Sequence, residues 1–262
     1  MKIRDLTEHL ETIAPLHLQE SYDNAGLLTG KFEWDITGVM ISLDATEAVI
    51  DEAIANECNV VVSHHPIIFS GLKKVNGYHY IERSIIKAIK HDIAIYAIHT
   101  NLDNVLKNGV SMEMCKRLEL DNVQILAKKD NPSLEAGLGA IGLLPEAMSP
   151  MDCLQYIKDK MKTNTIRHTA LLDRNIEKVA VCGGSGASFL PHAIRQGADL
   201  YISADFKYHE FFDSDDEIII ADIGHYESEQ FTIDLLYEIL KEKFSNFALF
   251  CTTVTTNPIK YY

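Results

Sequence analysis

The segment Asn59-Val60-Val61-Val62-Ser63-His64-His65-Pro66 joins an apolar run to two adjacent imidazoles. The run predicts a short buried strand over residues 60–63, and the two histidines follow it directly. Side chains of neighbouring residues on an extended backbone point to opposite sides, so one ion is poorly placed to bind both rings. We therefore expect two metal ions, each of which takes one ring.

Two further pairs of potential metal ligands follow predicted strands. His99 and Asp103 come after the strand that follows residues 60–63, and His225 and Glu229 come after a strand nearer the C-terminus. In parallel α/β sheets, ligands gather at the carboxyl ends of the strands. A lone histidine after a strand is usually structural, but three groups in the same position favour a shared metal site over that alternative.

Strands and helices alternate along the chain, an order that predicts parallel sheets covered by helices. The predicted strands are residues 36–43, 60–63, 93–98, 137–144, 178–182, 200–203, 217–223 and 247–254. The predicted helices are residues 46–58, 80–91, 110–118, 151–161 and 231–244, with one more that opens after Gly186 and ends near residue 196.

The alternation breaks at residues 130–133. We predict an α/β fold of two interleaved α/β lobes with mainly parallel sheets, and a dinuclear metal site at the carboxyl ends of strands between the lobes. The first lobe is expected to comprise residues 1–126 and 226–262, and the second residues 127–225.

The composition narrows the function and the compartment. The 262 residues carry a net charge of -14, which argues against salt-driven binding to nucleic acid and against an anionic membrane surface. The five cysteines are odd in number and form no Cys-x-x-Cys pair, which is typical of a reducing cytosol. We find no signal peptide and no apolar stretch of the ~20 residues that span a bilayer, so a cytoplasmic protein is expected.

The spacing of the candidate residues suggests how they share two ions. His225 and Glu229 are four apart, which places both on one face of a helix. We assign one ion to His64, Asp103 and Glu229 and the other to His65, His225 and Glu229, although His64 and His65 could exchange ions. Glu229 is the bridge in either case. Imidazole and carboxylate ligands suit two divalent metal ions per subunit, Zn, Fe, Mn or Ni.

Five ordered segments resemble one known family over nearly the whole chain. They are Tyr22-Asp23-Asn24-Ala25-Gly26-Leu27, Ser63-His64-His65-Pro66, His99-Thr100-Asn101-Leu102-Asp103, Gly183-Gly184-Ser185-Gly186 and Gly224-His225-Tyr226-Glu227-Ser228-Glu229. The chain is similar to the GTP cyclohydrolase 1 type 2 homologues, also called the Ngg-interacting-factor-three-like family. At 262 residues it resembles the short form, without an inserted domain. Tyr22 stands where that family usually has Trp.

The resemblance implies a two-metal site built from the same five ligands. It also implies a toroidal homohexamer whose metal sites face an interior cavity. The activity that it implies is hydrolysis of a nucleotide-like small molecule, of the GTP cyclohydrolase type. A metal-binding scaffold or metal-delivery protein without fast catalysis has the same ligands, so sequence does not separate the two functions.

Four further positions have two interpretations each. His99 is a candidate catalytic proton shuttle, or else it orients Asp103 through a hydrogen bond. The segment of residues 183–186 either presents backbone N–H groups to a phosphate or forms a plain tight turn. Asp205 and His209 either line the cleft or cap a short helix.

Overall fold

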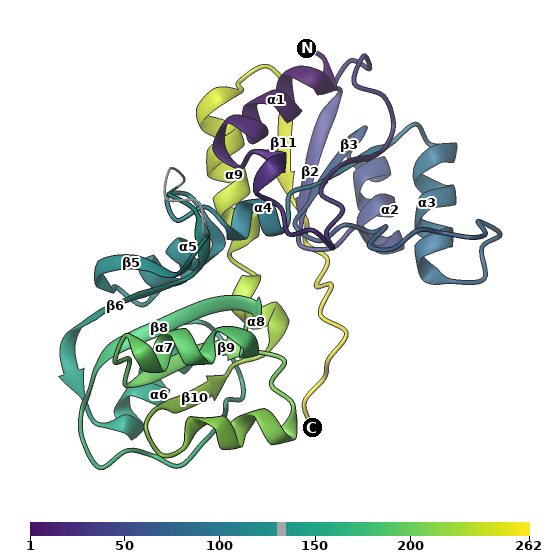
Figure 1. Ribbon diagram of the computed structural model, residues 1–262. Coiled ribbons are helices and arrows are strands. Elements are labelled where there is room, and N and C mark those ends of the chain that lie inside the picture. The colour runs from purple at the N-terminus through teal and green to yellow at the C-terminus, as the bar shows by residue number, and fades with distance from the viewer. Residues whose placement is uncertain (130–134) are drawn as a thin grey trace. The chain divides into compact units, whose positions relative to one another are not determined.

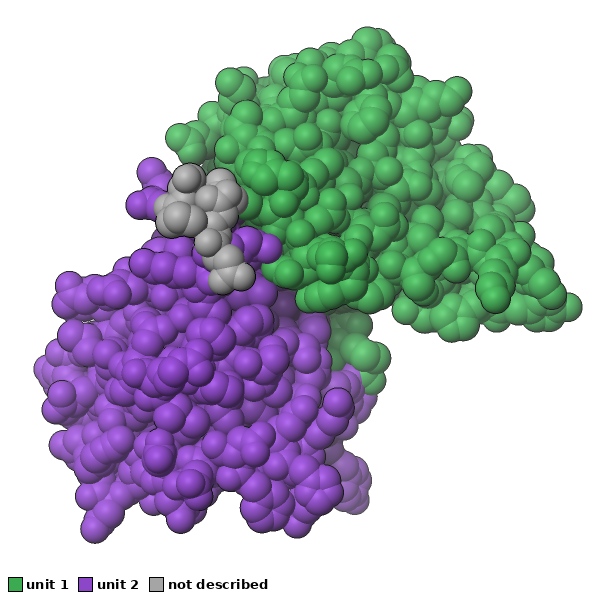
Figure 2. Space-filling view, viewed as in Figure 1, with its two compact units in different colours: residues 1–102, 232–258 green, residues 103–231, 259–262 purple. Residues whose placement is uncertain are grey.

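The computed structural model describes residues 1–129 and 135–262. These residues form two compact units, which Figure 2 colours separately. The first unit comprises Met1–Leu102 and Thr232–Pro258, and the second comprises Asp103–Phe231 and Ile259–Tyr262. The predicted break at residues 130–133 lies outside the described residues.

Two segments belong to a different unit from the lobe in which we expected them. Residues 103–126 fall in the second unit because strand β5 (Asp121–Lys128) pairs with β6 (Gly137–Met148). Residues 226–231 also fall there, and the hydroxyl of Ser228 accepts a 2.9 Å hydrogen bond from the backbone N–H of Gly184. The chain therefore crosses between units at residues 102/103, 231/232 and 258/259, whereas the predicted crossings are at 126/127 and 225/226.

The sheet of the first unit has the strand order β1-β4-β3-β2-β11. These strands are β1 (Gly26–Thr29), β2 (Gly38–Ser42), β3 (Val60–Ser63), β4 (Ala94–Ala97) and β11 (Ala248–Cys251). All neighbouring pairs are parallel except β1 and β4. The prediction of a mainly parallel sheet is confirmed for this unit.

Helices cover both faces of the first sheet (Figure 1). They are α1 (Ile3–Ile13), α2 (Glu47–Ala55), α3 (Tyr80–Lys90) and α9 (Thr232–Lys243), with a short 3-10 turn η1 (Leu16–Leu18). Helix α2 begins after Thr46, whose hydroxyl accepts a hydrogen bond from the N–H of Val49 and so caps the first turn. The apolar sides of α2 and α3 bury Ile50 and Ile85 in one core cluster with Val61 of β3.

The sheet of the second unit has the order β5-β6-β8-β9-β10-β7 and mixed directions. Its other strands are β7 (Arg167–His168), β8 (Ile176–Ser185), β9 (Leu200–Ala204) and β10 (Ile219–Asp222). Only the pairs β8/β9 and β9/β10 are parallel. The prediction of a mainly parallel sheet is wrong here, because β5 and β6 follow one another without the helical crossover that parallel pairing requires.

The helices of the second unit are α5 (Val110–Arg117), α6 (Pro150–Lys160), α7 (Leu190–Arg195) and α8 (His225–Glu229), with 3-10 segments η2 (Ala187–Phe189) and η3 (Tyr208–Ser214). One core cluster joins Cys115 of α5 and Ile157 of α6 to the sheet, and another joins Leu190 of α7 to it. Helix α4 (Thr100–Asp103) is a single turn at the boundary between the units. All five cysteines are free thiols, four of them buried. Among the described residues, no helix has both the length and the apolar character needed to cross a membrane.

Candidate metal centre

The carboxyl ends of β2, β3 and β4 lie level at one edge of the first sheet. Ser42 pairs with Ser63, and Ser63 pairs with Ala97. Beyond these ends, the N–H of His64 donates to Ser42 O at 3.2 Å, and the N–H of Ile98 donates to Ser63 O at 2.9 Å. The residues that follow the three strands therefore lie at the same edge of the sheet, as the sequence predicts for His64, His65 and His99.

Three imidazoles gather at this edge. The ring centroid of His64 lies 4.9 Å from that of His65 and 5.3 Å from that of His99. One potential ligand nitrogen from each ring lies within 4.8 Å of the others. The opposed orientation predicted for His64 and His65 is not observed, because β3 ends at Ser63 and strand alternation does not extend to them. The three rings together have the donor set of a metal site.

Each of these rings is oriented by a hydrogen bond at Nδ1. The His64 Nδ1–H donates to the backbone carbonyl of Ile98 at 2.8 Å. His65 Nδ1 lies 2.8 Å from Asp44 Oδ1, and His99 Nδ1 lies 2.7 Å from Asp23 Oδ1. A neutral imidazole that donates from Nδ1 carries its lone pair on Nε2. The oxygen partners thus select Nε2 as the metal-binding nitrogen, the arrangement that metal-ligating histidines usually have.

Asp23 is the most strongly held of these oxygen partners. Its Oδ2 accepts hydrogen bonds from both the backbone N–H, at 3.0 Å, and the hydroxyl of Thr100. Burial opposes ionisation of Asp23, but the hydrogen bonds from His99 and Thr100 outweigh it and lower the pKa to about 2. Asp23 is therefore ionised at neutral pH and fixes the position of His99.

Sequence reasoning missed Asp23 and Asp44 as parts of this site. Asp44 follows β2 just as His64 and His99 follow their strands, so the rule of strand ends would have found it. Asp23 lies in an irregular segment before β1, and only the Tyr-Asp-Asn segment of the resemblance pointed to it. Both residues act on the site through a histidine ring.

In the second unit, His225 and Glu229 stand at the two ends of α8. His225 Nε2 lies 3.1 Å from Glu229 Oε2, so the predicted helical spacing does bring the two side chains together. His225 Nδ1 lies 2.7 Å from Oδ2 of Asp205, which follows β9. Gly224, at a φ of +95°, forms the turn between β10 and α8. This pair repeats the pattern of the first unit: an imidazole oriented at Nδ1 by an oxygen.

The two carboxylates change the charge state of His225. Burial disfavours the charged ring, but the hydrogen bonds to Asp205 and Glu229 outweigh it and raise the pKa of His225 to about 11. Without a metal ion the ring is therefore an imidazolium at neutral pH. A cation that binds Nε2 must displace that proton.

Within the glycine segment of residues 183–186, Gly183 and Gly184 lie against the Glu229 side chain. Gly183 and Gly184 lie within β8, which continues to Ser185, so the predicted tight turn does not form at these two glycines. The predicted helix does open after Gly186, as η2 followed by α7. A Cβ at Gly184 would lie 2.4 Å from Glu229 Oε1, and Gly184 has a φ of +60°. Glycine is therefore required here by the close approach of the carboxylate, not by a phosphate.

Asp103 ends α4 and belongs to the second unit with Glu229. Burial, together with the negative charges of Asp103 and Glu229, raises the pKa of the Cys182 thiol to about 12. Both carboxylates therefore act on the same buried sulfur next to Gly183. Within the second unit, this places Asp103 in the same electrostatic environment as the predicted bridge.

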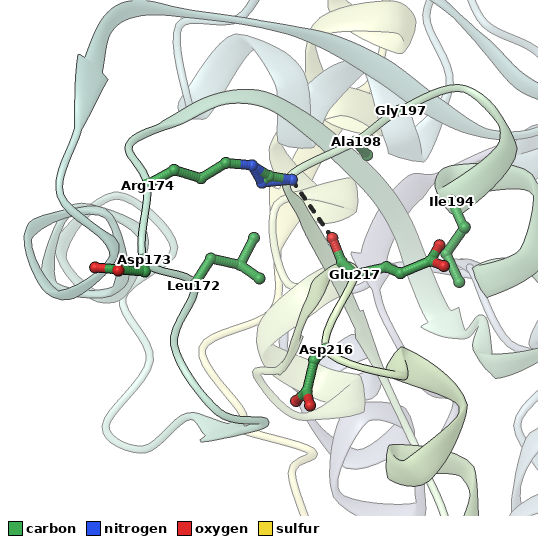
Figure 3. A pocket seen from close by; sticks show the side chains of 8 residues that line it. All are labelled: Leu172, Asp173, Arg174, Ile194, Gly197, Ala198, Asp216 and Glu217. Carbon is green, nitrogen blue, oxygen red and sulfur yellow. Dashed lines mark hydrogen bonds between the residues drawn. The ribbon is translucent and has the colours of Figure 1, made fainter.

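The remaining candidates have different surroundings. Asp205 orients His225, whereas His209 is exposed on η3, where its ring contacts Tyr208 and Phe212. A pocket of about 530 Å³ in the second unit is lined by charged side chains that include Arg174 and Glu217 (Figure 3). Its lining residues precede β8, β9 and β10, so it opens at the end of these strands opposite to that of His225.

The sequence as a whole matches one protein family. The family described as Duf34/NIF3 (NGG1p interacting factor 3) matches residues 1–258. The chain belongs to this family. The resemblance seen in the motifs is thereby confirmed.

Curated relatives match most or all of the chain, and they include both proteins of similar length and longer ones. A Clostridium acetobutylicum protein named GTP cyclohydrolase 1 type 2 homolog is 36% identical over 230 residues, which cover 87% of this chain and 85% of that protein. A Campylobacter jejuni protein of the same name is 29% identical over 266 positions, and the alignment covers 100% of both chains. The alignment with a Staphylococcus epidermidis member spans 370 positions, so that relative carries residues that this shorter chain lacks.

Solved structures of the family confirm the mixed α/β fold with two sheets. The crystal structure of the Staphylococcus aureus protein SA1388 matches with a TM-score of 0.92 at 29% identity, covering 100% of this chain and 99% of that chain. A Bacillus cereus protein related to NIF3 matches with a TM-score of 0.91 at 25% identity, with the same coverage.

Proposed function

We propose that this protein binds two divalent metal ions per subunit and hydrolyses a nucleotide-like small molecule with their help. In this proposal His64, Asp103 and Glu229 hold one ion, and His65, His225 and Glu229 hold the other. Glu229 is the bridging ligand. The name GTP cyclohydrolase 1 type 2 homolog, which the relatives carry, supports a guanine nucleotide as the substrate to test first.

The orientation of the imidazoles is the observation that carries the proposal. The three histidines proposed as ligands, His64, His65 and His225, each have Nδ1 within 2.8 Å of an oxygen acceptor. Such a bond leaves Nε2 available for a cation, which is the orientation that metal-ligating histidines usually have. The ligand types suit Zn, Fe, Mn or Ni.

The surroundings of Glu229 also fit a cation. Its side chain is only 4% exposed, and a buried carboxylate is costly unless it is paired with positive charge. Gly184 leaves room for its Oε1 where any other residue would place a Cβ. A bound ion at this position would replace the His225 proton as the partner of the carboxylate.

The chain's own residues have distinct roles in the proposed reaction. Bound divalent ions supply Lewis acidity and lower the pKa of water. Asp23 holds the His99 ring in one orientation at the edge that carries His64 and His65. His99 Nε2 is then the atom that accepts or returns a proton, and Asp23 stabilises the imidazolium that this creates.

Metal counting combined with a turnover assay tests this function. Purified wild-type protein should contain two ions per subunit by mass spectrometry, and it should release formate from GTP only while metal is present. His65→Ala should lose both metal and turnover. His99→Ala should keep the metal and lose turnover by roughly 100-fold or more, the usual size of general acid–base catalysis.

His209→Ala is the matched control, because it removes an exposed imidazole of the second unit and should change neither quantity. Turnover that survives complete removal of metal would refute the proposal. Two bound ions with no turnover of any nucleotide, together with transfer of metal to an acceptor protein, would instead support the metal-delivery alternative.

A further inference from the structure

Two exposed aromatic rings flank the imidazole cluster of the first unit. Tyr22 is 62% exposed and Phe69 is 49% exposed. Their ring centroids lie 6.2 Å apart at an interplanar angle of 45°. The Phe69 ring also meets His99 edge to face, with centroids 6.2 Å apart at 74°. The aromatic surface is thus continuous with the ring of the candidate proton-transfer residue.

Hydrogen bonds made by the neighbouring residues fix the chain on which both rings are carried. Tyr22 precedes Asp23, whose carboxylate accepts hydrogen bonds from His99 and Thr100. Phe69 follows Ile68, whose carbonyl accepts a 2.6 Å hydrogen bond from the side-chain amide of Asn24. One short segment therefore anchors the two aromatic residues and the histidine to each other. Such a surface is formed before a ligand arrives, which lowers the ordering cost of binding.

The exposure of these rings is what a stacking surface requires. Tyr and Phe usually bury much of their surface, and exposed aromatics grouped beside a polar site are typical of ligand recognition. Planar aromatic ligands such as nucleobases pack on such faces whatever their hydrogen-bonding edge. Phosphate groups, which are charged and strongly hydrated, gain little from them.

We propose that Tyr22 and Phe69 receive the planar aromatic ring of the substrate, and that the substrate is therefore a compound of the nucleobase class. The inference rests on the proposed function, since it places the ring beside His99 and the metal ligands. It adds the residues that recognise the base and separates base recognition from metal binding.

A matched pair of ligands isolates the aromatic ring. Guanosine 5′-monophosphate and ribose 5-phosphate share the sugar phosphate, and the base of the first is replaced by a hydroxyl group in the second. Their affinities for metal-loaded full-length protein can be compared by calorimetry. The wild type should bind the nucleotide at least tenfold more tightly than the sugar phosphate. Tyr22→Ala and Phe69→Ala should each weaken nucleotide binding roughly tenfold, with unchanged metal content and unchanged affinity for ribose 5-phosphate.

Two further variants distinguish recognition from folding. Tyr22→Trp preserves a stacking face and should retain nucleotide binding, whereas Tyr208→Ala removes a ring that is 72% exposed on η3 and should leave it unchanged. Nucleotide binding by the wild type that is insensitive to both alanine variants would overturn the inference alone. Equal affinity of the wild type for the two ligands would do the same, and binding of neither ligand would overturn the proposed function as well.

Discussion

The Nδ1 atom of His99 lies 2.7 Å from Oδ1 of Asp23, a residue 76 positions earlier in the chain. The Asp23 side chain is fully buried, and its second oxygen is held by Thr100. An irregular segment before β1 thus fixes a ring that follows β4. The first prediction depends on this pair.

Loss of the Asp23 charge should destabilise the protein in a way that depends on pH. The pKa of Asp23 is about 2 in the folded protein, below its ordinary value of 3.8. The ionised carboxylate therefore contributes about 2 kcal/mol above pH ~4, and this contribution is lost as the pH falls toward 2. Urea unfolding of Asp23→Asn should show a deficit of that order at pH 7 that shrinks at pH 3. The exposed Asp159→Asn serves as the control, and a deficit that stays constant with pH would contradict the prediction.

Removal of the proposed bridge should affect both ions. Glu229→Gln keeps the size of the side chain but loses its charge, so it should empty both metal positions. His64→Ala should chiefly weaken one of them. Mass spectrometry of the native protein counts the ions, with Glu238→Gln, which changes an exposed glutamate of α9, as the control. Equal loss of a single ion in both variants would remove the bridging role.

Gly184→Ala should damage the site by steric conflict with Glu229. The added Cβ would lie 2.4 Å from Glu229 Oε1, and the φ of +60° is itself unfavourable for alanine by about 1 kcal/mol. Gly197→Ala is the matched control, because Gly197 has a φ of +69° but nothing within 4 Å of the new Cβ. We expect Gly197→Ala to lower stability only, and Gly184→Ala to lower both stability and metal content. Equal metal content in the two variants would contradict the steric argument.

Asp205→Asn should lower the pKa of His225 in metal-free protein. Burial disfavours the imidazolium, but Asp205 and Glu229 raise its pKa from 6.5 to about 11. Because the folded value lies above the ordinary one, this stabilisation is complete below pH 6.5 and is lost as the pH rises toward 11. NMR titration of the ring protons measures the shift directly, with the exposed Asp213→Asn as the control. An unchanged pKa in Asp205→Asn would show that Glu229 alone holds the proton.

The sequence predicts where the imidazoles lie, but it does not predict which carboxylates accept hydrogen bonds from them. His64, His99 and His225 follow strands, and parallel strands deliver such residues to one edge whatever the rest of the fold. Asp44 alone does not indicate a metal site, because an acidic residue just before a helix is commonly a cap for that helix. Asp23 belongs to no periodic element, so nothing local indicates that it meets a residue 76 positions away.

The second sheet was predicted less well for a physical reason. Strand β5 is exposed along its first half and carries little of the apolar alternation that marks a strand. The Gly183-Gly184 pair likewise predicts a turn, because glycine usually interrupts strands. These positions lack a side chain because the Glu229 carboxylate approaches them closely, a tertiary contact that no local pattern encodes.

The contact between Gly184 and Glu229 also makes the two positions epistatic. The closest atom to a Cβ at position 184 would be Oε1 of Glu229, and the next would be Cε1 of His225, at 3.2 Å. Shortening residue 229 to aspartate would relieve the first contact and leave the contact with His225 and the backbone cost of the positive φ. The harm done by Gly184→Ala should therefore be smaller in a Glu229→Asp background than in the wild type, although part of it should remain.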